Sequence, residues 1–205
     1  MEKSRDVEKD IIEAARKVFV SKGFSRATMR DIAKEANINI AMLHYYFRSK
    51  ENLFDIIFEE AFNTILNNIF NAVNNNNNSL FEKIESIITQ YITTLIANPY
   101  LPNFIFNEIT QTPERLGKKI KDSSIFVEMF KKFSEDIDSE IKNGTIRQIN
   151  TITLFMNIIS MCVFPFLAKP IVTQLFDMNE EQYNILLEAR KKIVTDFVIN
   201  SIKIK

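Results

Sequence analysis

The chain has 205 residues, 46% of them hydrophobic and 25% charged, a composition that excludes an intrinsically disordered protein. Only 3 Gly and 5 Pro are present, too few for a turn-rich all-β fold. The net charge is zero, but residues 1–52 hold 11 Lys and Arg against 8 Asp and Glu, and the remainder is acidic. A mildly basic N-terminal segment suits contact with a polyanion.

A soluble cytoplasmic protein without a membrane segment is the expected setting. The N-terminus is charged and has no signal-peptide apolar region. Cys162 is the only cysteine, so no intrachain disulfide exists and a reducing compartment is expected. The most apolar stretch, residues 152–167, contains Asn157, Ser160 and Pro165 and is short for a membrane span.

Apolar residues at helical spacing predict a first helix that ends near Gly23, a residue suited to a left-handed helix end. Thr28 opens a second helix, and Asp31 follows three residues later in the pattern of a capping box. The apolar residues of the first helix are Val7, Ile11, Ala14, Ala15, Val18 and Phe19.

A tight turn and a third helix follow. Asn37 suits a left-handed turn residue, and Asn39 is positioned to cap a helix that buries Leu43 and Phe47. Two short helices joined by such a turn place side chains in a DNA major groove. Tyr46 and Phe47 are predicted to belong to the core of this head rather than to its surface.

Ser49 caps a fourth helix that runs to about residue 73. Its start belongs to the head and its end reaches the rest of the chain, so it is a candidate rigid lever. The Asn74–Asn78 run favours a loop, because Asn competes for backbone hydrogen bonds. The buried stripe predicted for this helix is Leu53, Ile57, Ala61, Ile65 and Ile69.

The remaining pattern is also helical, which predicts an all-α chain of about nine helices. Pro113 suits a helix start, Gly117 interrupts that helix early, and its apolar pattern continues to Gly144. Residues 152–167 are apolar nearly all round, and Pro165 should kink or end their helix. The other predicted helices cover residues 80–97, 100–110 and 180–202.

Residues 8–54 resemble the N-terminal signature of TetR-family transcriptional regulators. The resemblance implies a DNA-binding domain over residues 1–52 and a helical effector-binding and dimerisation domain over residues 53–205. It also implies a homodimer that usually represses transcription and releases a palindromic operator when a ligand moves the fourth helix. The matching residues are Phe19, Gly23, Thr28, Asp31, Ile32, Ala33, Ala36, Leu43, Tyr45, Tyr46, Phe47 and residues 49–53.

The resemblance assigns DNA contacts by position. Thr28 and Arg30 match residues that reach the DNA backbone or an adjacent base, and Arg30 could bind guanine with two hydrogen bonds. Lys50 matches a phosphate-binding lysine at a helix start, where the helix dipole favours an anion. The other matching positions are the leading edge of the third helix, Asn39, Ile40, Ala41 and Met42, and the aromatic pair His44 and Tyr45.

Three departures from the family pattern affect these contacts. His44 replaces the usual tyrosine, and Asn37 stands where glycine is usual. Ile40 and Met42 are apolar where polar side chains that read bases are common. Base recognition would then rely on thymine methyl groups and DNA shape.

The aromatic residues of the body allow two interpretations, an ordinary core or the wall of an apolar cavity between helices. In the second case a small, mostly apolar effector would bind, and no obvious buried charge would hold an anion. The candidate ligand contacts are Tyr91, Phe104, Asn107, Phe130, Phe133 and Asn157.

Dimerisation is predicted to use residues 152–167 and 180–202, packed against a second copy as a four-helix bundle. The first of these segments is apolar on more faces than one monomer core can cover. The candidate interface residues are Phe155, Ile159, Val194 and Phe197.

Other classes of function are weighed against this hypothesis. An enzyme is not expected, because the chain has one His, no catalytic arrangement and no glycine-rich phosphate loop. One His and one Cys also make a zinc site of the usual kind improbable, so neither a metal nor a cofactor is expected. Cys162 is predicted to be a buried, inert thiol. The alternative is a DNA-bound protein-interaction factor without an effector, which a solid, cavity-free body would favour.

Overall fold

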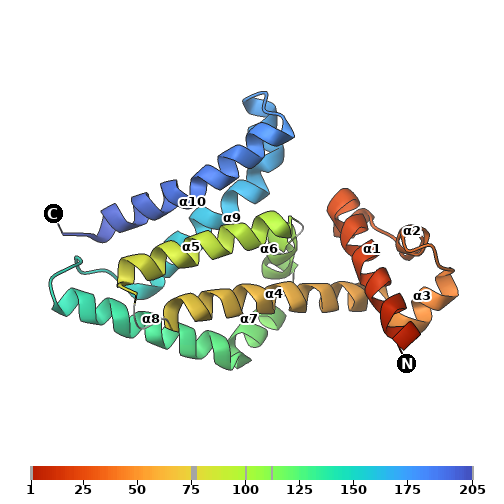
Figure 1. Ribbon diagram of the computed structural model, residues 1–205, viewed down its shortest axis with the longest axis horizontal. Helices are drawn as coiled ribbons and strands as arrows, with labels where there is room; N and C mark the ends of the chain where they lie inside the picture. Colours follow the sequence, from red (N-terminus) through yellow and green to blue (C-terminus); the bar gives the residue numbers. More distant parts are fainter. Residues whose placement is uncertain (1, 75–77, 100, 112, 205) are drawn as a thin grey trace.

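The computed structural model describes residues 2–74, 78–99, 101–111 and 113–204, and these residues form ten helices (Figure 1). The predicted all-α fold is confirmed; among the described residues the only β-type pairing is an isolated bridge between Ile146 and Lys203. The helices are α1 (Glu2–Arg26), α2 (Met29–Glu35), α3 (Ile40–Phe47), α4 (Lys50–Asn74), α5 (Leu80–Ala97), α6 (Leu101–Gln111), α7 (Pro113–Asp122), α8 (Ser124–Lys142), α9 (Thr151–Leu175) and α10 (Glu180–Ile202).

The first three helices and the start of α4 form a small head at one end of the molecule (Figure 1). Aromatic rings pack against one another in its core. The ring centroid of Phe54 of α4 lies 4.9 Å from that of Phe19 and 4.7 Å from that of Phe24. The regular α1 helix is interrupted at Gly23, whose φ of 73° and ψ of 160° are open to glycine but not to other residues. The large side chains that are completely or almost completely buried in the head include Ile11, Phe19, Ile32, Leu43, Phe47 and Leu53.

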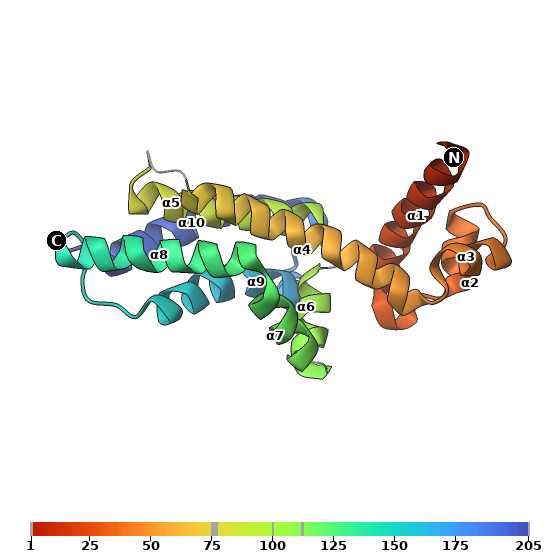
Figure 2. The ribbon, with the colours of Figure 1, turned by 90° about the horizontal axis from the view of Figure 1, so that it is seen from below.

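Helix α4 extends from the head into the body, where it packs along α5 and α8 (Figure 2). Its predicted stripe is buried throughout, from Leu53 to Ile69. The helix includes Asn74, whereas residues 75–77 of the predicted Asn loop lie outside the described residues. One continuous helix therefore contributes to both the head and the body core.

Helix α5 forms the middle of the body, in contact with α4, α8, α9 and α10. Its hydrophobic side is buried, and its N-terminus is fixed by a capping box between Ser79 and Glu82. Lys83 is buried as well, and its ammonium group donates to Asp136 of α8 at 2.6 Å. This ion pair joins α5 to α8 across the body.

The prediction of one helix from Pro113 to Gly144 is wrong, because two helices occupy this range. Ser123 has extended backbone angles and caps α8 by accepting a hydrogen bond from the Phe126 amide at 3.3 Å. Gly117 lies inside α7 without interrupting it. A single internal glycine costs a helix only about 1 kcal/mol, so the Ser cap sets the break instead.

The prediction that Pro165 kinks or ends its helix near residue 167 is also corrected. Helix α9 continues through Pro165 and Pro170 to Leu175. Pro165 has no amide hydrogen for the carbonyl of Met161, four residues earlier. Arg190 of α10 supplies the missing donor, because its Nη2 atom lies 2.7 Å from that carbonyl oxygen.

Helix α9 is consequently longer than expected. Among the described residues it is the one helix long and apolar enough to cross a membrane by length and composition, with a mean hydropathy of 1.9. It nevertheless packs against α5, α6 and α10 in the folded body. Only 28% of its most apolar window is buried, so much of the apolar surface of this helix is exposed.

Candidate functional site

The outer surface of the head is built on helix caps that the sequence specifies. Thr28 and Asp31 form the predicted capping box at the start of α2. Lys22 of α1 adds a hydrogen bond to Asp31, with 2.7 Å between Nζ and Oδ1. The hydrogen bonds from Lys22 and then from Thr28 lower the pKa of Asp31 to about 2, so this carboxylate stays charged at neutral pH.

The turn between α2 and α3 adopts the predicted geometry. Asn37 has a φ of 53°, in the left-handed region that Asn tolerates. Asn39 caps α3, because its Oδ1 atom accepts a hydrogen bond from the Met42 amide at 2.7 Å. Leu43 and Phe47 anchor the inner side of α3 in the core. The opposite side of α3 is therefore presented outward at a fixed angle.

Most of the predicted DNA contacts are exposed, either on α3 and its cap or at the start of α2. Tyr45 is 82% exposed, the largest exposure among the large hydrophobic residues of the described chain, whereas Tyr46 is half-buried. Met42 is also half-buried and belongs to the edge of the surface rather than its centre. The exposed candidates are Thr28, Arg30, Asn39, Ile40, Ala41, His44 and Tyr45.

Two basic candidates already make contacts inside the head. Lys50 donates to the Phe24 carbonyl at 3.0 Å and lies 4.3 Å from the centroid of the Phe24 ring. An ammonium group has three hydrogens, so this bond leaves others for a phosphate. Nδ1 of His44 lies 2.9 Å from the Arg48 carbonyl oxygen, which leaves Nε2 available. Arg48 itself is exposed beside them, although the sequence pattern did not single it out.

The body contains an apolar cavity of about 430 Å³. It lies between α4, α5, α7, α8 and α9, with α6 at its edge. The described residues that line it are Phe62, Ile65, Leu66, Ile69, Tyr91, Ile105, Ile109, Pro113, Leu116, Gly117, Ile120, Phe126, Met129, Phe155 and Ile159.

Only some of the predicted ligand contacts line this cavity. Tyr91 lines the cavity; its role in binding stays a prediction. Asn157 is exposed on α9, and Phe133 is 2% exposed in the core, so neither lines the cavity. Phe130 packs behind the wall, with its ring 5.7 Å from that of Phe155. The side chains of Phe104 and Asn107 lie outside the described residues.

The predicted interface residues also need correction. Phe155 and Ile159 face the cavity instead of a second copy, and Val194 is 2% exposed in the core. Phe197 alone of the four is largely exposed. The helical register explains the difference, because α9 turns Phe155 and Ile159 inward while Ile152 and Met156 point outward.

Cys162 is buried as predicted, and its burial raises the pKa of the thiol to about 12. The described residues contain no group of three His, Cys, Asp or Glu side chains that could hold a metal ion.

An exposed recognition helix on a three-helix head, joined by a shared helix to an all-helical body with a cavity, defines a helix-turn-helix protein of the transcription-regulator type. A sequence model described as "Bacterial regulatory proteins, tetR family" matches residues 11–57. Over these residues the chain is similar to the TetR family, a family of bacterial transcriptional regulators.

Individual relatives agree with this assignment. "Probable HTH-type transcriptional regulator YttP" of Bacillus subtilis (strain 168) is 30% identical over 101 residues, covering 49% of each chain. The negative transcriptional regulator IcaR of the biofilm operon icaADBC, from Staphylococcus aureus (strain Newman), is 31% identical over 121 residues, 54% of this chain and 65% of that protein. The alignments thus span about half of the first of these relatives and just under two thirds of the second.

Solved structures share the fold along nearly the whole chain. The hemolysin II transcriptional regulator HlyIIR aligns with a TM-score of 0.67 at 24% identity, covering 98% of this chain and 99% of that one. The TetR family regulator PfmR from Thermus thermophilus aligns with a TM-score of 0.66 at 16% identity, covering 91% and 97%.

Proposed function

We propose that this protein is a homodimeric, ligand-responsive transcriptional regulator, a repressor that leaves a palindromic operator when a small, mostly apolar effector enters the body cavity. The observation that carries the proposal is the course of α4. Its first turn packs inside the DNA-binding head, and its later residues Phe62, Ile65, Leu66 and Ile69 form one wall of the cavity. A ligand that displaces this wall would therefore move the head.

Repression is the sign of regulation favoured by the relatives, because IcaR is named a negative regulator. The cavity favours the effector hypothesis over a DNA-bound interaction factor, for which a solid body was expected. The domain division near residues 52 and 53 is part of this proposal, with α4 crossing the boundary.

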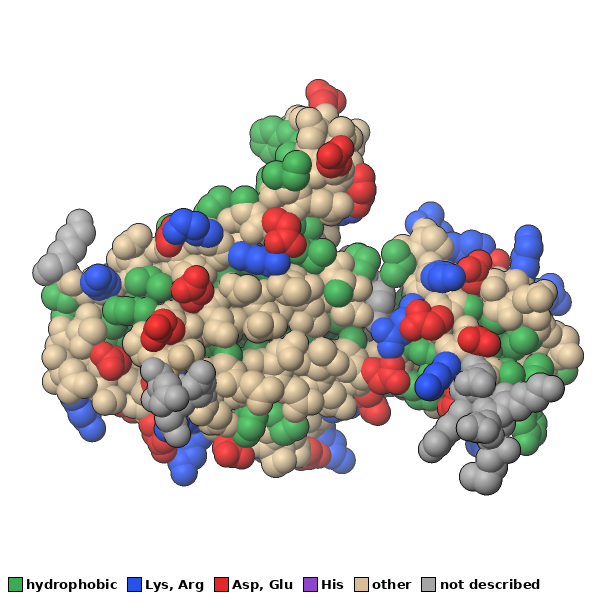
Figure 3. All heavy atoms as spheres, viewed as in Figure 1, with side chains coloured by type: hydrophobic (Ala, Val, Ile, Leu, Met, Phe, Trp, Pro, Cys, Tyr) green, Lys and Arg blue, Asp and Glu red, His purple; other side chains and the backbone are tan. Residues whose placement is uncertain are grey.

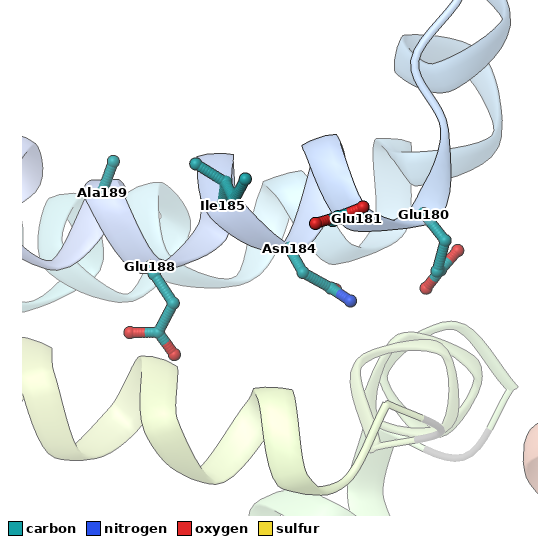
Figure 4. Close-up of a pocket in the computed structure, with 6 residues that line it drawn as sticks. All are labelled: Glu180, Glu181, Asn184, Ile185, Glu188 and Ala189. Carbon is teal, nitrogen blue, oxygen red and sulfur yellow. The ribbon is translucent and has the colours of Figure 1, made fainter.

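The dimer is supported by an uncovered apolar surface on α9 and α10, called here the hairpin face. Its large residues are each more than half exposed and are spaced four or eight positions apart: Ile152, Met156 and Phe164 on α9, and Ile185, Ile193 and Phe197 on α10. In Figure 4, Ile185 and Ala189 point away from α5, whereas Asn184 and Glu188 point toward it. Hydrophobic side chains also gather on the projecting end of the two helices in Figure 3.

The small residues of the hairpin face suggest where a second copy would cross. The hydrogen bond from Arg190 to the Met161 carbonyl sets Ser160 and Ala189 at the same level of the helix pair. Larger residues flank both of them. Ridges with a four-residue spacing pack into each other's grooves, and small residues at the centre allow a close approach.

The test is recovery of bound genomic fragments with the purified protein at two salt concentrations. The proposal expects one short palindrome with half-sites about 34–36 Å apart, or a multiple of that distance. Weak, uniform binding that modest salt abolishes would contradict it. A ligand that shifts the recovered fragment from bound to free in a mobility assay would establish the effector response.

A further inference from the structure

The wall of the cavity indicates which chemistry it accepts. None of the described residues that line it carries a charge, and Tyr91 is the only one with a polar side-chain atom. The nearby Lys119 of α7 is held outside, because its ammonium group pairs with Glu59 at 2.5 Å. A charged ligand would lose its hydration without gaining an ionic partner from these residues, which is strongly unfavourable.

Tyr91 supplies the one polar side-chain group among the described residues of this wall. The residue is 7% exposed, and its hydroxyl makes no hydrogen bond with any described residue. Burial is also the main cause that raises the pKa of Tyr91, so the phenol stays neutral and keeps its hydrogen. The hydroxyl oxygen is not among the fully buried atoms that lack a partner, so a molecule in the cavity can reach it. Tyrosine hydroxyls in largely buried positions usually have a hydrogen-bond partner.

The size of the cavity sets a second limit. A cavity of about 150 Å³ holds benzene, so 430 Å³ has room for a molecule of roughly two such rings or an aliphatic chain of similar volume. Its edge is accessible from solvent, because Ile109 is 54% exposed and Gly117 is exposed on α7.

We infer that the cavity takes an uncharged, largely apolar molecule with one hydrogen-bond-accepting oxygen, such as a ketone, ester or ether, which the Tyr91 hydroxyl binds. This inference rests on the proposed function, in which the same cavity is the effector site. It predicts weaker binding of anionic ligands such as fatty-acid carboxylates, because no described residue of the wall offers them an ionic partner.

The charge limit is tested with two fluorescent dyes that differ by a sulfonate, neutral N-phenyl-1-naphthylamine and anionic anilinonaphthalene sulfonate. The expected result is that the neutral dye binds the full-length protein at least about tenfold more tightly, because the anion must be desolvated. A Cβ built at Gly117 meets no heavy atom within 4 Å. Gly117→Trp should therefore be accommodated without unfolding the protein, and because Gly117 borders the cavity, the added indole should weaken neutral-dye binding.

The hydrogen bond is tested by displacing the neutral dye with octan-2-one, octane and octanoate. Tyr91→Phe should weaken octan-2-one roughly three- to tenfold, the range for one net hydrogen bond, and should leave octane unchanged. Tyr46→Phe is the matched control, because Tyr46 lies in the head. Octanoate should displace the dye more weakly than octan-2-one from the wild-type protein.

Three outcomes would overturn the inference: equal binding of both dyes, displacement by octanoate as strong as by octan-2-one, or no ketone-specific effect of Tyr91→Phe. Absence of any cavity-dependent binding, judged by Gly117→Trp, would overturn it as well. A mobility assay on the same samples separates the two proposals. Ligand binding of the expected chemistry without release of DNA would contradict the effector role alone.

Discussion

The pKa of Asp31 depends on a small set of polar contacts at the start of α2. Its pKa of about 2 lies below the ordinary value of 3.8, and the bond from Lys22 is the largest cause. A lowered pKa in the folded state means that this stabilisation is complete above about pH 3.8 and is lost as the pH falls through about 2. The contact therefore helps to hold the recognition helices at neutral pH.

Lys22→Ala should raise the pKa of Asp31 toward 3.8, measured by NMR titration of its carboxyl carbon. Lys17→Ala is the control, because Lys17 pairs with Glu35 and not with Asp31. The capping box with Thr28 would still hold the pKa somewhat below 3.8. An unchanged Asp31 titration in Lys22→Ala would show that the cap alone sets the pKa.

Lys50 is the residue expected to contact a phosphate. Lys50→Ala should weaken binding to all DNA fragments alike and should reduce the salt slope of the binding constant by about 1. Lys50→Arg should keep most of the slope because it keeps the charge. The far-end body variant Lys142→Ala should change neither quantity, and a slope that survives Lys50→Ala would remove the phosphate role.

At the scale of elements, α9 and α10 stabilise each other where α9 contains proline. Arg190→Met removes the donor that satisfies the Met161 carbonyl and should lower the free energy of unfolding by about 1.5–3 kcal/mol. Pro165→Ala restores an amide hydrogen at that turn, so the same Arg190 substitution should cost less in this background. Urea unfolding of the four proteins at one protein concentration measures the difference. Equal costs in both backgrounds would disprove the compensation.

Local signals in the sequence were sufficient to predict the head. Caps at Thr28 and Asn39, the left-handed Asn37 and the spacing of apolar residues act over a few positions, and each has the expected geometry. The continuation of α9 past Pro165 could not be predicted in this way. It depends on Arg190, which is 25 residues away in sequence and reaches α9 only in the folded body.

The cavity was harder to predict than the caps. An apolar helix face has the same sequence pattern whether it packs into a solid core or lines a cavity. Phe133 and Phe155 have the same side chain, yet Phe133 fills the core and Phe155 borders the cavity. Only the relative placement of α4, α7, α8 and α9 separates them. For the same reason, Phe155 and Ile159 were assigned to the exposed face of α9, whereas they border the cavity. The use of this helix in a dimer stays a prediction.

At the scale of the whole molecule, the hairpin face should control the oligomeric state. The double substitution Ile193→Lys and Phe197→Lys places two charges on this apolar face and should produce monomers, measured by sedimentation equilibrium. Val127→Lys is the control, because Val127 is 54% exposed on α8, outside the hairpin face. A dimer that persists in the double variant would place the interface elsewhere.

The same monomeric variant should also lose affinity for DNA, although no residue of its head has changed. Two linked heads bind two half-sites with an effective concentration that strengthens binding by about 10²–10⁴ over one head. The double variant should therefore bind the recovered palindrome no more tightly than wild-type protein binds a single half-site, whereas Val127→Lys should bind normally. Mobility assays on whole and half palindromes measure both quantities. If the monomer kept full affinity for the palindrome, one head would be sufficient for recognition and the α9 and α10 pairing would serve another purpose.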